Sequence, residues 1–271
     1  HDQRKEPPVS RPSPADIEAM SHDLLQARAN RVPIAAFTDR FPDMTVEDAY
    51  AVQQGLVAGL MTDDETIIGY KLGLTSRPMQ QMLGVDQPDY APVLGSTVYA
   101  DGSDVRMDDF IDPKMEAEIC VVLGSELSGP RCTVAEAWEA TSGLIAALEI
   151  VDSRIADWKI KLADTISDLA SNGAVAFGSR VVPLGDYDPA LLGMVFTANG
   201  DLVATGAGAA ALNGPIDAVA WLANTLHPLG VTLPAGSIIM TGALHAAVPL
   251  QRNAVWRAEF DRLGPITLRT V

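Results

Sequence analysis

Two glutamates one residue apart, Glu116 and Glu118, lie in an otherwise apolar stretch that runs from Met115 to Leu123. Side chains alternate between the two faces of a β-strand, so both glutamates would share one face and the other would be apolar. Burying two adjacent carboxylates unpaired is costly, and a hard divalent cation such as Mg²⁺ would resolve the conflict. The alternative is an edge strand with two solvated acids and Lys114 as a surface partner.

A lysine and two hydroxyl residues stand out further upstream. Lys71 lies inside an apolar, glycine-spaced stretch that is typical of a strand, so it either extends to the surface or is buried for a purpose. Thr75 and Ser76 follow that strand. They could hold an anion through hydroxyls and backbone amides, or they could cap a helix over residues 77–83.

Further polar groups interrupt apolar runs. Asp89 lies in a loop, where an acid is usually solvated, and Glu149 is a third acid in apolar surroundings. The stretch from Leu162 to Gly178 mixes polar and apolar residues. It has the composition of a pocket wall, or of a solvated helix with surface ion pairs. Another apolar run ends in Thr241 and Gly242, where the backbone could approach a ligand closely.

Helix and turn signals outline the elements that must position these residues. Capping patterns at Ser13, Thr45 and Thr133 predict three helices, the last of them running to about Ala147. An Asn-Gly pair predicts a hairpin over residues 194–205, and the last third of the chain is mostly strand-like around one helix that starts near Pro215.

Composition narrows the classes of function. The chain has 271 residues, 48% of them hydrophobic, and a formal net charge of −16, which argues against nucleic-acid binding. No run approaches the roughly 20 apolar residues of a membrane span. Two cysteines, Cys120 and Cys132, give no disulfide framework, so we expect a cytoplasmic protein. Residues 1–12 are polar and are expected to form a disordered tail.

Five stretches together resemble a known family, in order and spacing over nearly all of residues 13–271. They are Gly69–Ser76, Glu116–Glu118, Leu148–Arg154, Asp157–Asp168 and Gly206–Asn224. The chain is similar to the 2-hydroxypenta-2,4-dienoate (2-oxopent-4-enoate) hydratases of aromatic meta-cleavage pathways, within the fumarylacetoacetate hydrolase superfamily.

The resemblance implies an α+β fold. We expect an N-terminal α/β layer over residues 13–98 and a catalytic domain over residues 99–271, built as a mixed β-sandwich or β-roll. It also implies Mg²⁺ or Mn²⁺ held by Glu116, Glu118 and Glu149. The implied substrate is a small 2-oxo or 2-hydroxy dienoic acid, and we expect a homo-oligomer that can associate with a partner enzyme of the pathway.

The same resemblance assigns roles to individual residues. Lys71 and Asp89 match catalytic positions of the family. We assign substrate binding to the remaining candidates, which are Thr75, Ser76, Lys159, Asp164, Thr241 and Gly242. Two stretches depart from the family pattern. Relatives usually read Asp-Asn-Ala-Ser where this chain has Asp-Leu-Ala-Ser at 168–171, and residues 243–246 also differ. Both departures concern the end of the substrate away from its carboxylate.

Three other functions remain open. A sister enzyme decarboxylates 2-oxo-3-hexenedioate (4-oxalocrotonate) with the same metal chemistry on a substrate that carries a second carboxylate. Hydrolysis of an acylpyruvate usually needs a water-activating histidine, and the chain has none between His22 and His227. A non-catalytic scaffold subunit would not need Lys71, Asp89 and all three glutamates.

Overall fold

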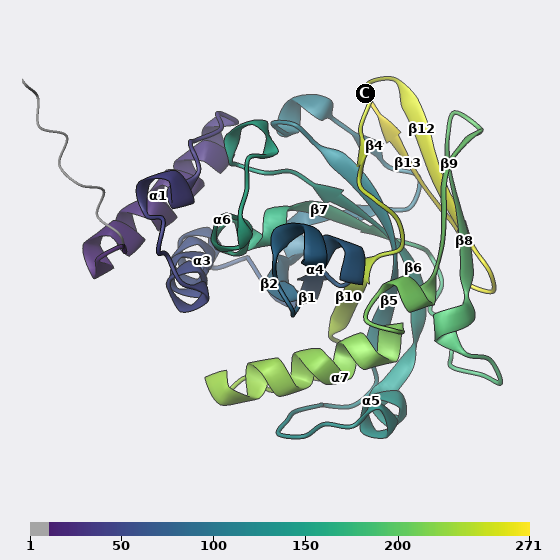
Figure 1. Ribbon diagram of the computed structural model, residues 1–271. Helices are drawn as coiled ribbons and strands as arrows, with labels where there is room; N and C mark the ends of the chain where they lie inside the picture. Colours follow the sequence, from purple (N-terminus) through teal and green to yellow (C-terminus); the bar gives the residue numbers. More distant parts are fainter. Residues whose placement is uncertain (1–10) are drawn as a thin grey trace, which may run out of the picture.

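The computed structural model describes residues 11–271 as two β-sheets and a set of covering helices (Figure 1). The first ten residues of the predicted tail lie outside the described part. The large sheet has the order β2-β1-β10-β5-β6-β7-β3, with β11 paired to β5, and the small sheet has the order β4-β13-β12-β8-β9. Parallel pairs (β1 with β10, β3 with β7) occur beside antiparallel ones, so the predicted mixed α+β fold is confirmed.

The elements have the following bounds. The large sheet contains β1 (Ile67–Gly73), β2 (Asp89–Leu94), β3 (Val98–Ala100), β5 (Lys114–Leu123), β6 (Thr141–Val151), β7 (Asn172–Phe177), β10 (Ile238–Ala243) and β11 (Val248–Pro249). The small sheet contains β4 (Asp104–Val105), β8 (Gly193–Ala198), β9 (Asp201–Ala207), β12 (Ala254–Phe260) and β13 (Gly264–Thr270). The helices are α1 (Pro14–Asn30), α2 (Phe37–Arg40), α3 (Val46–Leu60), α4 (Arg77–Leu83), α5 (Val134–Ala140), α6 (Leu162–Ser167) and α7 (Pro215–Leu226).

Capping boxes start three helices where the sequence predicts them. The side chains of Ser13, Thr45 and Thr133 each accept a hydrogen bond from the backbone three residues on, and the acid there accepts one from the cap backbone. Such caps satisfy two N–H groups that a helix start would otherwise leave unpaired. The predicted hairpin is also confirmed, because Asn199 and Gly200, both with positive φ, join β8 to β9.

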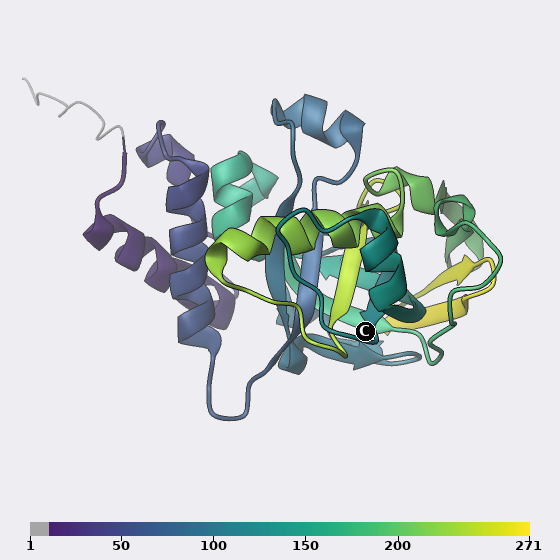
Figure 2. The same ribbon diagram turned by 90° about the horizontal axis from the view of Figure 1, so that it is seen from below.

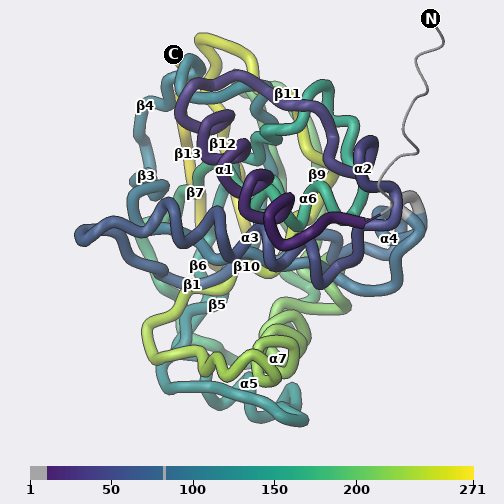
Figure 3. The backbone as a smooth tube through the Cα atoms, turned by 90° about the vertical axis from the view of Figure 1, so that its left-hand side faces the viewer, coloured from purple at the N-terminus to yellow at the C-terminus, as the bar shows by residue number. Residues whose placement is uncertain are grey.

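Helices cover the large sheet on different sides. Helices α1, α3 and α6 pack together beside β2, around a core of their own that includes Leu24, Val52 and Ile166. Figures 1 and 3 show this group apart from α5 and α7, which lie together along the sheet. The main core fills the space between α7, the large sheet and the small sheet. In Figure 2, α4 stands out from the sheet on its connecting segments.

One predicted element is wrong. The helix that begins after Thr133 ends at Ala140 instead of near Ala147, and the chain turns directly into β6. Alanine favours helix, but the following residues include Ile145, Leu148 and Ile150, which fit a strand buried on both faces. Pairing with β5 on one side and β7 on the other therefore outweighs the local helix preference.

Strands from both predicted domains share the large sheet. β1 and β2 precede the predicted boundary at residue 98, yet β1 pairs with β10 from the C-terminal part. Arg11, placed in the predicted tail, forms an ion pair with Asp48 at 2.9 Å.

Across residues 11–271, none of the helices has both the length and the apolar character that crossing a bilayer requires.

A core substitution on β6 tests how the sheet is stabilised. Leu148 is fully buried on the face opposite its neighbour Glu149. We expect Leu148→Ala to lower the free energy of unfolding by about 2–5 kcal/mol, because it leaves a cavity in the main core. Urea denaturation measures this. Leu202→Ala on β9 is the control, because that side chain is 67% exposed and should change stability little. Equal losses in both variants would contradict the placement of β6.

Candidate metal and acid–base site

The register of two central strands brings the three glutamates together. In the antiparallel pair of β5 and β6, Glu116 lies directly opposite Glu149, and Glu118 lies opposite Ala147. Each glutamate offers a carboxylate oxygen within 4.8 Å of the others. Glu118 and Glu149 are fully buried, whereas Glu116 keeps partial exposure.

Burial makes this cluster electrostatically unfavourable on its own. Withdrawal from water and the negative charge of Glu149 raise the pKa of Glu116 to about 7 and that of Glu118 well above its usual range. Glu118 Oε1 and Glu149 Oε2 have no hydrogen-bond partner among the described residues. Unpartnered buried oxygens in a closely spaced, all-carboxylate set fit a hard divalent cation.

Lys71 supplies the positive charge nearest to the cluster. It extends from β1, and its Nζ lies 3.1 Å from Glu149 Oε1 and donates to the carbonyl oxygen of Ala170 at 2.8 Å. Burial alone would lower the pKa of Lys71, but the carboxylates of Glu149 and Asp89 outweigh it and raise that pKa. An ammonium has three N–H donors, so one remains for a substrate oxygen.

Asp89 is buried at the start of β2 rather than in a solvated loop. It pairs with Gly73 of β1, and its Oδ1 has no hydrogen-bond partner within residues 11–271. Burial raises the pKa of Asp89 to about 6, although Lys71 opposes the shift. A Cβ atom at position 73 would lie 2.2 Å from Asp89 Oδ1, so only glycine leaves room for this carboxylate. A carboxyl group with such a pKa suits proton transfer near neutral pH.

A turn with a strained backbone lies next to Lys71. Leu169, Ala170 and Ser171 all have positive φ, which costs about 1–2 kcal/mol per non-glycine residue. The turn directs the Ala170 carbonyl to Lys71. It is followed by Asn172, whose Nδ2 donates to Glu149 Oε1 at 2.8 Å.

Arg154 holds both ends of this turn. Its Nη2 donates to the carbonyl oxygen of Asp168 at 2.7 Å, and its Nη1 donates to that of Asn172 at 3.0 Å. The Asp168 carboxylate in turn accepts from Arg154 Nε, so the buried charge is paired. Sequence reasoning did not place Arg154 or Asn172 in the site. The sequence feature that could have indicated them is the high density of polar residues within an apolar stretch.

Two of the predicted substrate-binding residues meet beside the glutamates. Gly242 has φ 115°, and a Cβ there would lie 2.0 Å from Thr75 Oγ1, so the two segments approach closely only because residue 242 is glycine. Its backbone N–H donates to Glu118 Oε2 at 3.0 Å. The hydroxyl of Thr241 donates to the Ile119 carbonyl instead, and Ser76 caps α4 through a 3.4 Å contact.

Lys159 and Asp164 have other partners. Lys159 is exposed and pairs with Asp157 at 3.1 Å. Asp164 is buried, but its carboxylate accepts from the N–H and hydroxyl of Thr38 and from the N–H of Lys161, which ties α2 to the start of α6. Within the described part of the chain, neither hydrogen-bonds to the glutamates, Lys71 or Asp89. Their role in substrate binding stays a prediction.

Comparison with known proteins agrees with the fold. The family model for the fumarylacetoacetate (FAA) hydrolase C-terminal region matches residues 70–271, and the chain belongs to this family. It is 39% identical over 254 residues to 2-keto-4-pentenoate hydratase of Paraburkholderia xenovorans (strain LB400), covering 94% of each chain. It is 37% identical to 2-oxo-hept-4-ene-1,7-dioate hydratase of Escherichia coli, over 92% of this chain and 95% of that one.

A solved structure is also similar over almost the whole chain. It is 4-oxalocrotonate decarboxylase from Pseudomonas putida G7, complexed with magnesium and adipate. The TM-score is 0.92 at 34% identity, over 96% of this chain and 99% of that chain. The similarity to the two named hydratases confirms the resemblance to the hydratase family that the sequence motifs indicate.

Proton release tests the metal cluster directly. Without a bound cation, burial and the charge of Glu149 raise the pKa of Glu116 to about 7 and that of Glu118 well above its usual range, so these carboxyl groups hold protons at higher pH than exposed ones do. A divalent cation needs the carboxylates ionised, so Mn²⁺ binding at pH 6.5 should release roughly one to two protons. Calorimetry in two buffers of different ionisation enthalpy counts them, and affinity should rise from pH 6 to pH 8.

Glu118→Gln is the matched variant for this measurement. It removes one ionisable ligand, so it should weaken Mn²⁺ binding and release fewer protons. Mn²⁺ binding that is independent of pH, or unchanged in Glu118→Gln, would exclude the cluster as the binding site.

Proposed function

We propose that this chain is a divalent-metal-dependent hydratase that converts 2-hydroxypenta-2,4-dienoate, or a short alkyl homologue, to 4-hydroxy-2-oxopentanoate or its homologue. The observation that carries the proposal is the convergence of three glutamates, two of them fully buried, with Lys71 and Asp89 on one region of the sheet. Similarity to named hydratases over 94% of the chain supports it.

The cation would occupy the space among Glu116, Glu118 and Glu149. When bound there, Mg²⁺ or Mn²⁺ would supply Lewis-acid polarisation of the C2 carbonyl and a hold on the C1 carboxylate. The C1 carboxylate of the substrate would also lie near Thr75 and the Gly242 turn, which approach each other beside Glu118.

The residues of this chain then divide the proton transfers. The dienol ketonises when C5 gains a proton and the C2 hydroxyl loses one, which makes the C3=C4 bond electrophilic. Asp89, as a carboxylate, takes a proton from water while the water oxygen adds to C4. It returns a proton to C3, so one water is consumed and Asp89 is regenerated. Lys71 stabilises the negative charge that develops on the C2 oxygen with its remaining N–H donor.

Chelation tests the activity itself. Purified protein should consume enzymatically prepared 2-hydroxypenta-2,4-dienoate, followed by loss of dienol absorbance. EDTA should abolish this activity, and added Mg²⁺ or Mn²⁺ should restore it. Full activity after removal of the metal would exclude the proposed chemistry.

The pH dependence tests Asp89 as the base. Its pKa of about 6 in the metal-free protein, and a lower one beside a cation, place the loss of activity at or below pH 6, because protonation removes the base. Asp89→Asn should lower kcat about 100-fold or more and abolish this acidic limb. Mn²⁺ affinity should change little. A variant with unchanged kcat would remove Asp89 from the mechanism.

Gly73→Ala tests the room that Asp89 needs. The added methyl group would collide with Asp89 Oδ1, so we expect kcat to fall at least tenfold while Mn²⁺ binding persists. Gly193→Ala, on β8, is the control, because a Cβ there meets nothing within 4 Å. If both variants keep full activity, the tight contact between β1 and β2 has no catalytic importance.

A second candidate is decarboxylation of 2-oxo-3-hexenedioate. It is supported by the structural similarity to the decarboxylase and by a cavity of about 530 Å³ next to Thr75 and Ser76, where Arg77 could pair with a second carboxylate. Incubation with each substrate separates the two activities, because only decarboxylation releases CO₂. Subunit number and association with a partner enzyme stay predictions from the family resemblance.

A further inference from the structure

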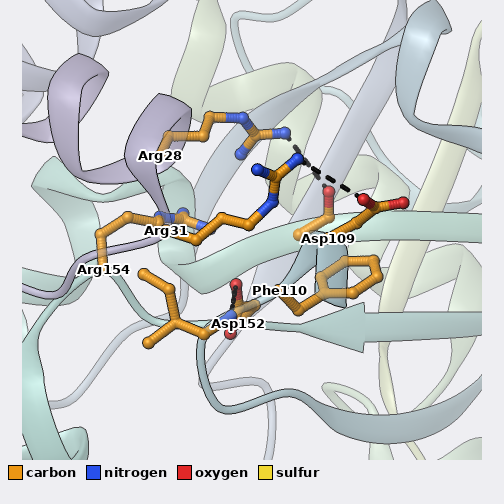
Figure 4. A pocket seen from close by; sticks show the side chains of 8 residues that line it. Arg28, Arg31, Asp109, Phe110, Asp152 and Arg154 are labelled. Carbon is orange, nitrogen blue, oxygen red and sulfur yellow. Dashed lines mark hydrogen bonds and ion pairs between the residues drawn. The ribbon is translucent and has the colours of Figure 1, made fainter. Parts of the chain in front are cut away.

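A second cavity is lined by Gly173, the residue that follows Asn172. Its volume is about 220 Å³. Figure 4 shows its polar side chains and the aromatic ring that faces them. The residues that line it are Arg28, Arg31, Asp109, Phe110, Ile111, Asp152, Arg154 and Gly173. Arg154 is shared with the turn beside Lys71, and the other lining residues have no part in the catalytic assignments above.

The three arginines of this cavity differ in how their charge is balanced. Arg154 pairs with Asp168, and Arg31 pairs with Asp109 at 3.4 Å near the surface. Arg28 pairs with no carboxylate within 4.0 Å in the part of the chain that the structure describes. Its guanidinium donates only to the carbonyl oxygens of Asn172 and Gly173, over long distances of 3.4 and 3.3 Å.

The carboxylates of Asp168 and Asp152 favour the positive charge of Arg28 from a distance, but neither pairs with it directly. Burial and the like charge of Arg154 lower the pKa of Arg28 to about 10, so the side chain still carries its proton at neutral pH. Asp152 does not form an ion pair with it. Both Asp152 carboxylate oxygens accept backbone N–H groups, from Ile111 and Asp112.

Polar groups form the larger part of the wall, and Phe110 and Ile111 add a smaller apolar part. The space beside the guanidinium is therefore not a purely ionic site. A planar guanidinium matches a carboxylate through two parallel N–H···O bonds, and Phe110 and Ile111 favour a ligand with a short hydrocarbon chain over inorganic phosphate.

We propose that this cavity is a binding site for a small organic monocarboxylate, with the carboxylate on Arg28 and its short chain against Phe110 and Ile111. The site is separate from the proposed metal site, and the inference does not depend on the proposed function. A volume of about 220 Å³ exceeds by several-fold the roughly 30 Å³ that one water occupies in the liquid, and it accommodates an acid of three to five carbons.

Fluorine NMR with 4,4,4-trifluorobutyrate as the probe tests the proposal on the full chain with saturating Mg²⁺. We expect saturable binding that weakens at least tenfold in Arg28→Gln. It should weaken less in Arg28→Lys, which keeps the positive charge but loses the two parallel N–H donors of the guanidinium. Arg40→Gln is the matched control, because Arg40 is an exposed arginine of the same N-terminal helical layer. It should bind like the wild type. Thermal melting establishes that each variant is folded.

Two further measurements distinguish this cavity from the metal site and from a general anion site. Glu118→Gln should keep the probe affinity, and butyrate should displace the probe at lower concentration than phosphate does. The proposal is overturned if folded Arg28→Gln and Arg28→Lys bind as well as the wild type, or if Glu118→Gln abolishes binding. It is likewise overturned if phosphate is the better competitor, or if the wild type does not bind the probe.

Discussion

The structure depends on three carboxylates that share one buried region of a β-sheet. The pairing of β5 with β6 fixes the opposition of Glu116 and Glu149, and the alternation of β5 adds Glu118 beside them. Hydrogen bonds from Asn172 and Gly242 satisfy part of this set, and Lys71 neutralises part of its charge. The remaining oxygens need a cation or protons, because buried carboxylates without partners are unfavourable.

Several neighbouring features hold the glutamates and Lys71 in this arrangement. Three consecutive residues with positive φ are unfavourable, yet they put the Ala170 carbonyl on Lys71 and start β7 with Asn172 next to Glu149. Arg154 compensates by bonding to the carbonyls at both ends of the turn. Close approaches at Gly73 and Gly242 bring β2 and the Thr75 segment near the glutamates. Backbone strain and tight packing thus occur next to the residues of the proposed chemistry.

Much of this could be predicted from the sequence. Alternation in a short apolar strand indicates that Glu116 and Glu118 share a face, and capping boxes mark helix starts, because both are local properties. Which strand lies opposite is a long-range property. The proximity of Glu149 came from the family resemblance, and the register of β5 with β6 is seen only in the structure. The helix predicted up to Ala147 failed for the same reason, because burial between two strands overrides local preference.

The location of manganese in crystals of this protein tests the central claim most directly. Anomalous scattering would show one Mn²⁺ peak, with an oxygen of Glu116, Glu118 and Glu149 each at about 2.0–2.3 Å. This result is predicted because the three carboxylates offer oxygens within 4.8 Å of one another. A peak elsewhere, or Glu149 turned away with no ion among the three residues, would contradict the account.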